Sequence, residues 1–489
     1  MSERYLSTLD LGTSKFALGV AKVSGSNAQV IYYKEAPADG VRYGCIYNPK
    51  KAANALRPLI GEAEEALGIQ IQRLIVGYPR FNVRQEGARK RIERSTPSSL
   101  ISEEEMRSLK DMALNDYPLE DPDHEIIYGA VAQSFSTDEL FNVTEDDIVG
   151  TTGDFIEGYY KVFIGAKKAS DNLDIMLNLL GIPPADKVFT PATTALAVLK
   201  ADERMSGTAL VEIGAGVTSV TICQQDILRC CASIPFGGSN VTKDIRHECA
   251  FSESLAENIK RAYGACLPDK LVSMGDKILQ INDEENGGYA VLPVKYLSEI
   301  ITERSREIIE AVLYLIQQSG YADKLRGGLV LTGGGARLTN LSAQFKELSG
   351  YHVRIGYPHT GAFSMDGCGS IGSLSGAASM GLLLDALAGP LNCMVDIPPV
   401  TSPQGPQPPA GPEQGGVADG GTVFDPPVPP VKPSGGAHTK GTGTRDKAPK
   451  GSRPPKENKI QWLIDTMGNL FGDTLGGIYD TMGQEDKNN

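Results

Sequence analysis

The chain has 489 residues, of which 41% are hydrophobic and 22% charged, a composition typical of a soluble protein with two or three packed domains. Its net charge of −13 argues against DNA or RNA as a main ligand, because nucleic-acid affinity rests on clustered Lys and Arg. We therefore expect no nucleic-acid partner. The eight cysteines contain no CxxC pair, which favours reduced thiols over a zinc or disulfide framework.

The N-terminal residues MSERYLST lack the apolar region of a secretory signal, and no stretch reaches the roughly 18 apolar residues of a membrane span. We expect the chain to stay on the cytosolic side. Asn48 as N-cap, Pro49 in the first turn and Gly68 as a stop signal predict one helix. Apolar runs predict strands at 6–12, 15–23, 28–35 and 73–79.

The character of the sequence changes at residues 81–163. A charged stretch is followed by Ser102 and Glu105, whose spacing predicts a capping box at the start of a short helix. Two strand-like segments come after it. This block therefore predicts a small inserted α/β subdomain. Further along, 293–320 predicts a long helix and 375–389 a helix rich in small residues.

Two short segments look like copies of one motif. Ser7 to Phe16 reads STLDLGTSKF, and Leu210 to Val220 reads LVEIGAGVTSV. Each has an apolar strand, an acid, one apolar residue and a glycine turn with hydroxyls, then another strand. Such a turn leaves backbone N–H groups that bind phosphate oxygens, and the acid can hold Mg²⁺ through its water shell. One copy is also compatible with an ordinary hairpin, whereas two indicate duplicated halves facing each other across a cleft.

A third glycine turn, Gly333 to Gly335, follows the strand LVLT. Glycines permit positive φ there and let a flat ligand lie against the backbone, although a tight strand-to-helix turn is the alternative. In this order the three turns resemble the nucleotide-binding set of the actin, Hsp70 and sugar-kinase superfamily. Within it, residues 5–390 resemble the bacterial cell-division protein family FtsA.

The resemblance implies an α/β fold class: an actin-like two-lobe ATPase fold made of duplicated ribonuclease-H-like domains, with an inserted α/β subdomain, a disordered linker and a C-terminal amphipathic helix. The domains it implies are the first lobe (1–80 and 164–205, with a return at 361–393), the insertion (81–163), the second lobe (206–360, with a smaller subdomain at 240–317), the linker (394–458) and the terminal helix (459–482).

The resemblance also implies ATP and Mg²⁺ as cofactors. Asp10 and Glu212 would position metal-bound water or phosphate, with Asp10 holding the metal through water. The nucleotide-binding residues that it implies are Gly12, Thr13, Ser14, Lys15, Gly214, Ala215, Gly216, Thr218, Gly237, Gly238, Glu257, Lys260, Gly333, Gly334, Gly335 and Arg337.

The second turn departs from the family pattern, because Glu212 replaces Asp and Ala215 takes a glycine place. The carboxylate of a longer acid need not lie where it would orient an attacking water. The segment FTPATTALAVL also offers no water-positioning Gln or His. We therefore predict ATP binding with at most slow ATPase activity.

Residues 394–458 hold half of the 30 prolines and few large apolar side chains, which indicates a disordered linker. A flexible chain of this length spans on the order of 40 Å. At 100° per residue the segment after it predicts an amphipathic helix. Its apolar residues are Ile460, Leu463, Ile464, Met467, Leu470, Phe471, Leu475 and Ile478, with Trp462 at the helix start.

Crossing a membrane would bury Asp465, Asp473 and Asp480 at roughly 3 kcal/mol each, whereas lying in the interface buries only the apolar face. Lys and Arg residues just upstream would attract anionic lipid. We therefore predict surface binding to membrane lipids; a helix that packs on its own domain is the alternative.

Within the long helix, Arg304 matches a basic residue with which FtsA proteins receive the C-terminal peptide of FtsZ, although a solvated charged face is the ordinary reading. The implied function is an ATP-binding protein that tethers FtsZ filaments to the cytoplasmic side of the cell membrane at the septum and recruits other division proteins. Self-association through the insertion is also implied. The alternatives are a small-molecule kinase of the same superfamily, or an actin-like pilus-assembly scaffold.

Overall fold

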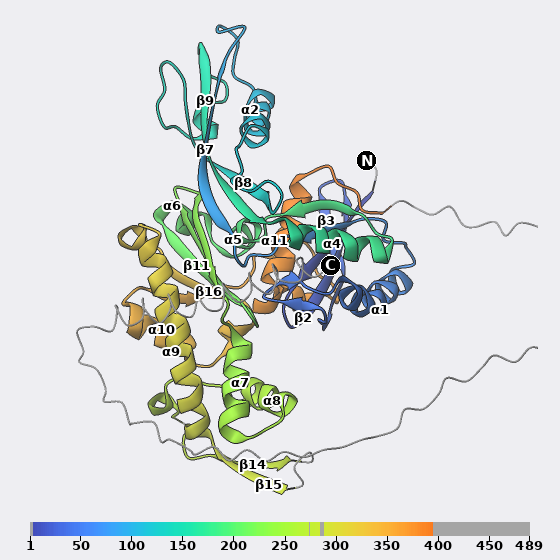
Figure 1. Ribbon diagram of the computed structural model, residues 1–489, viewed down its shortest axis with the longest axis vertical. Coiled ribbons are helices and arrows are strands. Elements are labelled where there is room, and N and C mark those ends of the chain that lie inside the picture. The colour runs from blue at the N-terminus through green and yellow to red at the C-terminus, as the bar shows by residue number, and fades with distance from the viewer. Residues whose placement is uncertain (1–2, 273, 284–287, 395–489) are drawn as a thin grey trace, which may run out of the picture. The chain divides into compact units, whose positions relative to one another are not determined.

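Two five-stranded sheets organise the part of the chain described by the computed structural model, residues 3–272, 274–283 and 288–394 (Figure 1). In the first sheet, antiparallel pairing joins the first three strands, and parallel pairing adds the other two beside the first strand. Its order is β10 (Pro184–Val188), β6 (Leu74–Gly77), β1 (Arg4–Leu11), β2 (Lys15–Ser24) and β3 (Asn27–Pro37).

The second sheet repeats this arrangement, again with three antiparallel strands and two parallel additions beside the first of them. Its order is β17 (Val353–Ile355), β16 (Gly328–Thr332), β11 (Thr208–Ile213), β12 (Thr218–Gln224) and β13 (Ile227–Ile234). Every residue of β11 is buried, as expected for a central strand covered on both faces. The predicted duplication is therefore confirmed: β1 corresponds to β11, and β6 to β16.

The helices of the first lobe are α1 (Pro49–Leu67), α4 (Lys167–Leu180), α5 (Thr190–Val198) and α11 (Ala377–Ala388), beside the small hairpin of β4 (Val41–Arg42) and β5 (Cys45–Ile46). The predicted caps of α1 are confirmed, because Asn48 Oδ1 accepts from the Lys51 N–H at 3.0 Å and Gly68 is left-handed with φ 66°. Helix α11 packs on α5, β1 and β2, which returns the chain to the first lobe. Gly381 permits the close approach, since a Cβ there would lie 2.6 Å from the Thr193 carbonyl oxygen.

The second lobe carries α6 (Ala201–Ser206), α7 (Gly238–Cys249), α8 (Glu253–Tyr263), the hairpin β14 (Ile278–Asp283) and β15 (Gly288–Pro293), α9 (Val294–Gln318) and α10 (Leu341–Ser349). Helix α9 packs against α7 and α10, and its buried side chains recur at helical spacing, which explains the long helix predicted from the sequence.

The insertion is a three-stranded antiparallel sheet of order β7 (Arg84–Glu93), β9 (Phe155–Ala166) and β8 (Glu125–Ser136), with α2 (Glu103–Asn115) and α3 (Glu145–Ile148) (Figure 1). The predicted capping box at Ser102 and Glu105 is present. The strands of the insertion also contact the second lobe: Gln133 Nε2 donates to the Leu228 carbonyl at 2.9 Å, and the Cys231 N–H donates to Gln85 Oε1 at 3.1 Å.

The linker predicted at 394–458 lies outside the described residues from residue 395 onward, and so does the whole helix predicted at 459–482. Within the described part, no helix has both the length and the apolar character needed to cross a membrane.

Candidate functional site

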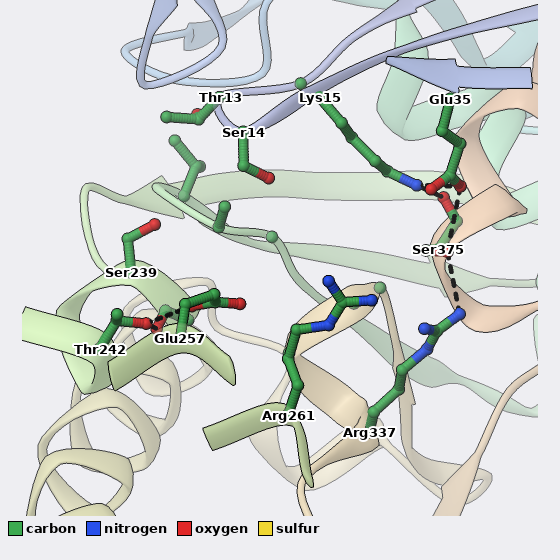
Figure 2. A pocket seen from close by; sticks show the side chains of 18 of the residues that line it. Thr13, Ser14, Lys15, Glu35, Ser239, Thr242, Glu257, Arg261, Arg337 and Ser375 are labelled. Atoms are coloured by element: carbon green, nitrogen blue, oxygen red, sulfur yellow. Dashed lines mark hydrogen bonds and ion pairs between the residues drawn. The ribbon is translucent and has the colours of Figure 1, made fainter. Parts of the chain in front are cut away.

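A cleft with a cavity volume of about 860 Å³ lies where the glycine turns of both sheets meet (Figure 2). Most of the residues assigned from the resemblance line it, although they come from segments more than three hundred residues apart. The assigned residues that line the cleft are Asp10, Gly12, Thr13, Ser14, Lys15, Glu212, Gly214, Ala215, Gly238, Glu257, Lys260, Gly333, Gly334, Gly335 and Arg337.

The two phosphate-type turns have the same geometry. The Gly12 N–H donates to the Lys15 carbonyl at 3.0 Å, and the Gly214 N–H donates to the Val217 carbonyl at 2.8 Å. A Cβ on either glycine would lie within 2.8 Å of that carbonyl oxygen, so each turn requires glycine at this place. The strands fold into these turns because the glycine permits the close approach of the backbone.

Three backbone N–H groups of the turn residues that line the cleft, those of Thr13, Ser14 and Ala215, have no hydrogen-bond partner within the described part of the chain. Backbone donors left unpaired at a turn form a concave site for anions. The carbonyl groups of the second turn are used differently: the Gly238 N–H donates to Gly214 at 2.9 Å, and the Ser239 N–H donates to Ala215 at 2.8 Å. The start of α7 is thereby fixed beside the turn.

The third turn follows β16 and continues into a 3₁₀ helix, Gly334–Arg337. Gly333 has φ 86°, and a Cβ there would lie 2.5 Å from the Ile213 carbonyl oxygen. A Cβ at Gly335 would lie 2.4 Å from Ile213 Cγ2. The turn therefore lies directly against the end of β11, and its bare backbone faces the cleft.

The wall formed by α7 and α8 carries a hydrogen-bonded group centred on Lys260. Its Nζ donates to Glu257 Oε2 at 2.6 Å, to Thr242 Oγ1 at 2.7 Å and to the Gly238 carbonyl at 2.9 Å. Burial lowers the pKa of Lys260. Burial raises the pKa of Glu257, but hydrogen bonds from Lys260 and Thr242 outweigh it, so the net shift is downward. Glu257 therefore remains an acceptor for a ligand hydroxyl.

On the opposite wall, Lys15 contacts Glu35 and donates to the Ser375 carbonyl at 3.0 Å. Ser375 also accepts from Arg337 Nη2 at 3.0 Å, so the first and third turns are joined through the segment before α11 (Figure 2). Burial raises the pKa of Glu35, but the Lys15 ammonium outweighs it and holds that pKa below its ordinary value. Arg261 on α8 also lines the cleft and has no ion pair or hydrogen bond within the described residues.

The sequence did not reveal four of the residues that line the cleft, Glu35, Arg261, Ser375 and Arg80, and Arg80 is the one that contacts both turn acids. Its guanidinium forms an ion pair with Glu212, and its Nη2 lies 4.0 Å from Asp10 Oδ1. Desolvation by burial is the largest effect on Asp10 and raises the pKa of its carboxyl group, although Arg80 acts in the opposite direction. The available signal was its position: Arg80 follows β6, which lies parallel to β1, the strand that carries Asp10.

Three assigned residues lie behind the cleft instead of lining it. Gly216 contacts the first turn, since a Cβ there would lie 2.8 Å from Thr13 Cγ2. Thr218 is buried and donates to the Phe236 carbonyl at 2.9 Å, and Gly237 packs against the Gly214 carbonyl oxygen. Arg304 lies on α9 and does not line the cleft. It pairs with Asp244 of α7, to which its Nη2 donates at 3.0 Å, and with Glu307.

The cleft fits a nucleoside triphosphate. It offers unpaired backbone donors from two turns, a glycine turn whose bare backbone lines it, and cationic side chains on both walls. The fit to magnesium is poor, because Arg80 already pairs with both turn acids. The described residues also contain no group of three or more His, Cys, Asp or Glu placed to hold a metal ion.

Residues 209–377 match the family model described as cell division protein FtsA. The cell division protein FtsA of Streptococcus pneumoniae serotype 2 (strain D39 / NCTC 7466) is 28% identical over 357 residues, which cover 73% of this chain and 76% of that protein. The FtsA of Bacillus subtilis (strain 168) is 26% identical over 358 residues, covering 73% and 79%.

Among solved structures, a chain of the PilM-PilN type IV pilus biogenesis complex superposes with a TM-score of 0.52 at 15% identity, covering 79% of this chain and 99% of that one. At this identity the likeness concerns the fold alone. The fold is the actin-like two-lobe fold, and the predicted resemblance to the FtsA proteins is confirmed.

Proposed function

Because the chain is related to the FtsA cell-division proteins, we propose that it is an ATP-binding division protein that tethers FtsZ filaments to the cytoplasmic side of the cell membrane at the septum. The observation that carries the proposal is the cleft in which both phosphate-type turns meet the third glycine turn. Recruitment of later division proteins belongs to the same proposal.

ATP would be held by the chain's own donors. The unpaired N–H groups of both turns would bind its phosphates, and Lys15 and Arg261 would add positive charge. Glu257 would accept from the ribose hydroxyls, and the bare backbone at Gly333 would lie against the base. A bound triphosphate supplies negative charge between the lobes, so it would draw the two turns together.

Turnover would be slow at most. A residue that orients an attacking water must be placed by that task, but the position of the Glu212 carboxylate is set by its ion pair with Arg80. Asp10 is also close to that guanidinium. The nucleotide would therefore set the conformation of the chain more than it would be consumed.

Self-association would use the insertion. Its tip exposes two large apolar side chains, Leu100 at 65% and Phe141 at 72%. Apolar side chains at such exposure favour contact with another surface. The partner in the proposal is a second copy of the chain.

The predicted terminal helix would provide the membrane contact. Full-length protein should co-sediment with vesicles that contain anionic lipid and should bring FtsZ with it, whereas a chain lacking residues 459–489 should remain in the supernatant. Phe471→Glu should weaken vesicle binding strongly because it places a charge on the predicted apolar face. Asn469→Glu, which adds the same charge to the opposite face, is the matched control. Equal sedimentation of the two variants would contradict the anchor.

The FtsZ contact is tested separately on α9. Arg304→Ala should lower recovery of FtsZ on vesicles without changing recovery of the chain itself. Arg306→Ala is the matched control, because Arg306 lies on the same helix and, among the residues that the structure describes, pairs only with Glu303, at 3.4 Å. If both variants retain FtsZ equally, Arg304 has no part in the contact.

A further inference from the structure

Arg80 bridges the acids of both phosphate-type turns. It pairs with Glu212 from the second lobe and lies 4.0 Å from Asp10 of the first. The three side chains are largely withdrawn from solvent, with exposed fractions of 17% for Arg80, 15% for Asp10 and 10% for Glu212. One guanidinium thus occupies the position between two carboxylates that face each other across the cleft.

The backbone around Arg80 is anchored on both sides. Before it, the Tyr78 N–H donates to the Val188 carbonyl at 2.8 Å, and the Tyr78 carbonyl accepts from Thr190 Oγ1 at 3.0 Å. The Tyr78 ring stacks on Tyr128 with centroids 4.2 Å apart. After it, the Phe81 ring lies 5.2 Å from that of Tyr43, which lines the cleft. The residues on both sides of Arg80 are therefore anchored, and the guanidinium itself is held by the two carboxylates.

Arg80 and a divalent cation would compete for the same two carboxylates. Magnesium requires a near-octahedral set of oxygen ligands, most of them water, and two cations sharing these acids would repel each other at short range. A guanidinium instead has several planar donors, so it can pair with a carboxylate and still donate to a phosphate oxygen. The two carboxylates at this position therefore suit a guanidinium better than a magnesium ion.

We propose that Arg80 takes the place of the divalent cation, so that this chain binds ATP without magnesium. The guanidinium neutralises the turn acids and donates to the terminal phosphates. The inference rests on the proposed ATP-binding function. It also explains the longer acid of the second turn: Arg80 comes from the first lobe, and the additional methylene lets Glu212 reach it from across the cleft.

The test is ATP binding to the full-length chain by calorimetry, in buffer with MgCl₂ and in buffer with EDTA. Wild-type affinity should differ by less than about threefold between the two buffers. Arg80→Gln should bind at least about tenfold more tightly with MgCl₂ than with EDTA, because the freed acids can then hold the metal. Arg337→Gln removes the same charge from the same cleft and should weaken ATP binding equally in both buffers.

Removal of Arg80 leaves two carboxylates unpaired, which could destabilise the fold. Circular dichroism therefore checks that Arg80→Gln is folded. The double variant Arg80→Gln with Glu212→Gln removes one of these charges and should also require MgCl₂ for tight ATP binding. In the absence of nucleotide, MgCl₂ should raise the unfolding temperature of Arg80→Gln but not that of the wild type.

Wild-type binding that appears only with MgCl₂ would overturn the role of Arg80 and leave the ATP-binding function intact. Absence of ATP binding in both buffers would overturn the ATP-binding function, and this inference with it.

Discussion

The two lobes share a sheet topology but differ at the loop after one equivalent strand. In the first lobe β6 is followed by a tyrosine, a proline and Arg80, whereas in the second lobe β16 is followed by Gly333, Gly334 and Gly335. Both loops line the same cleft. Duplication therefore fixes where a loop lies, while the residues of the loop decide whether it presents a charge or a bare backbone.

The acids of the two turns show a second asymmetry. Asp10 and Glu212 occupy the same register, opposite Ala17 and Ser219 respectively. Only Glu212 forms the close ion pair with Arg80, although Asp10 belongs to the lobe from which Arg80 comes. Equivalent positions whose acids differ by one methylene therefore differ in how closely they contact the guanidinium.

The strongest way to break this comparison is to give the second lobe a side chain at its glycine loop. Gly333→Ala should lower the free energy of unfolding by about 3 kcal/mol, because it combines a strained positive φ with a clash against the Ile213 carbonyl. Chemical denaturation measures the loss. Gly334→Ala is the control: nothing lies within 4 Å of a Cβ there, and its effect should stay within about 0.5 kcal/mol.

The contact between the two turns gives the next largest effect. Gly216→Ala places a methyl group 2.8 Å from Thr13 Cγ2 and should cost about 2 kcal/mol of unfolding free energy. Combining it with Thr13→Ala removes that methyl's nearest neighbour and should recover part of the loss. If denaturation shows that the costs of the two single variants simply add in the double variant, the two turns are not in steric contact.

Replacing Asp10, the acid of the first turn, by a neutral residue tests whether the two acids of the cleft wall affect stability with opposite signs. Burial raises the pKa of Asp10 above its ordinary 3.8, so its contribution to stability is complete below that value and is lost as pH rises through the folded-state pKa. Asp10→Asn should therefore raise the unfolding temperature at neutral pH. This gain in stability should be smaller than the loss expected for Gly333→Ala or Gly216→Ala. The gain should shrink as pH falls towards 3.8.

Glu257, in the second lobe, should affect stability in the opposite direction to Asp10, because its folded-state pKa is lowered. Its contribution is present above the ordinary value of 4.5 and is lost as pH falls. Glu257→Gln should accordingly lower the unfolding temperature at neutral pH. The same sign for both variants in thermal melts would contradict these assignments.

The smallest expected effect concerns the contact between the insertion and the second lobe. Gln133→Ala removes the hydrogen bond to the Leu228 carbonyl and the one that Gln133 Oε1 accepts from Arg229, and should cost about 1 kcal/mol of unfolding free energy. Gln280→Ala, at an exposed strand position, should be close to neutral. No difference between the two would mean that these contacts between the insertion and the second lobe add nothing to stability.

The sequence was most informative where structure depends on local residues. The caps at Asn48 and Ser102 act within three residues, and glycine turns are required by the adjacent backbone, so both were visible in short segments. The duplication could be predicted because the acid and glycine recur at the same spacing in Asp10–Gly12 and Glu212–Gly214. The resemblance then supplied the insertion and the order of the lobes.

The ionic contacts of the cleft could not be predicted in this way. Lys15 and Ser375 are 360 residues apart, and Arg80 meets Glu212 only after both sheets have formed. Within its own segment Arg80 looks like an ordinary charged residue after a buried strand. Thr218 shows the reverse case, because a hydroxyl in the motif turned out to support the backbone of the neighbouring loop.

The insertion has a mechanical consequence. Its strands continue the chain of the first lobe, yet Gln85 and Gln133 hold it by hydrogen bonds to β13 of the second. Any rotation that narrows the cleft must either shear these bonds or tilt the three-stranded sheet as a lever arm. The end of the insertion that carries Leu100 and Phe141 would then travel farther than the turns, so under the proposed function a small closure around a nucleotide would become a larger displacement at the surface proposed for self-association.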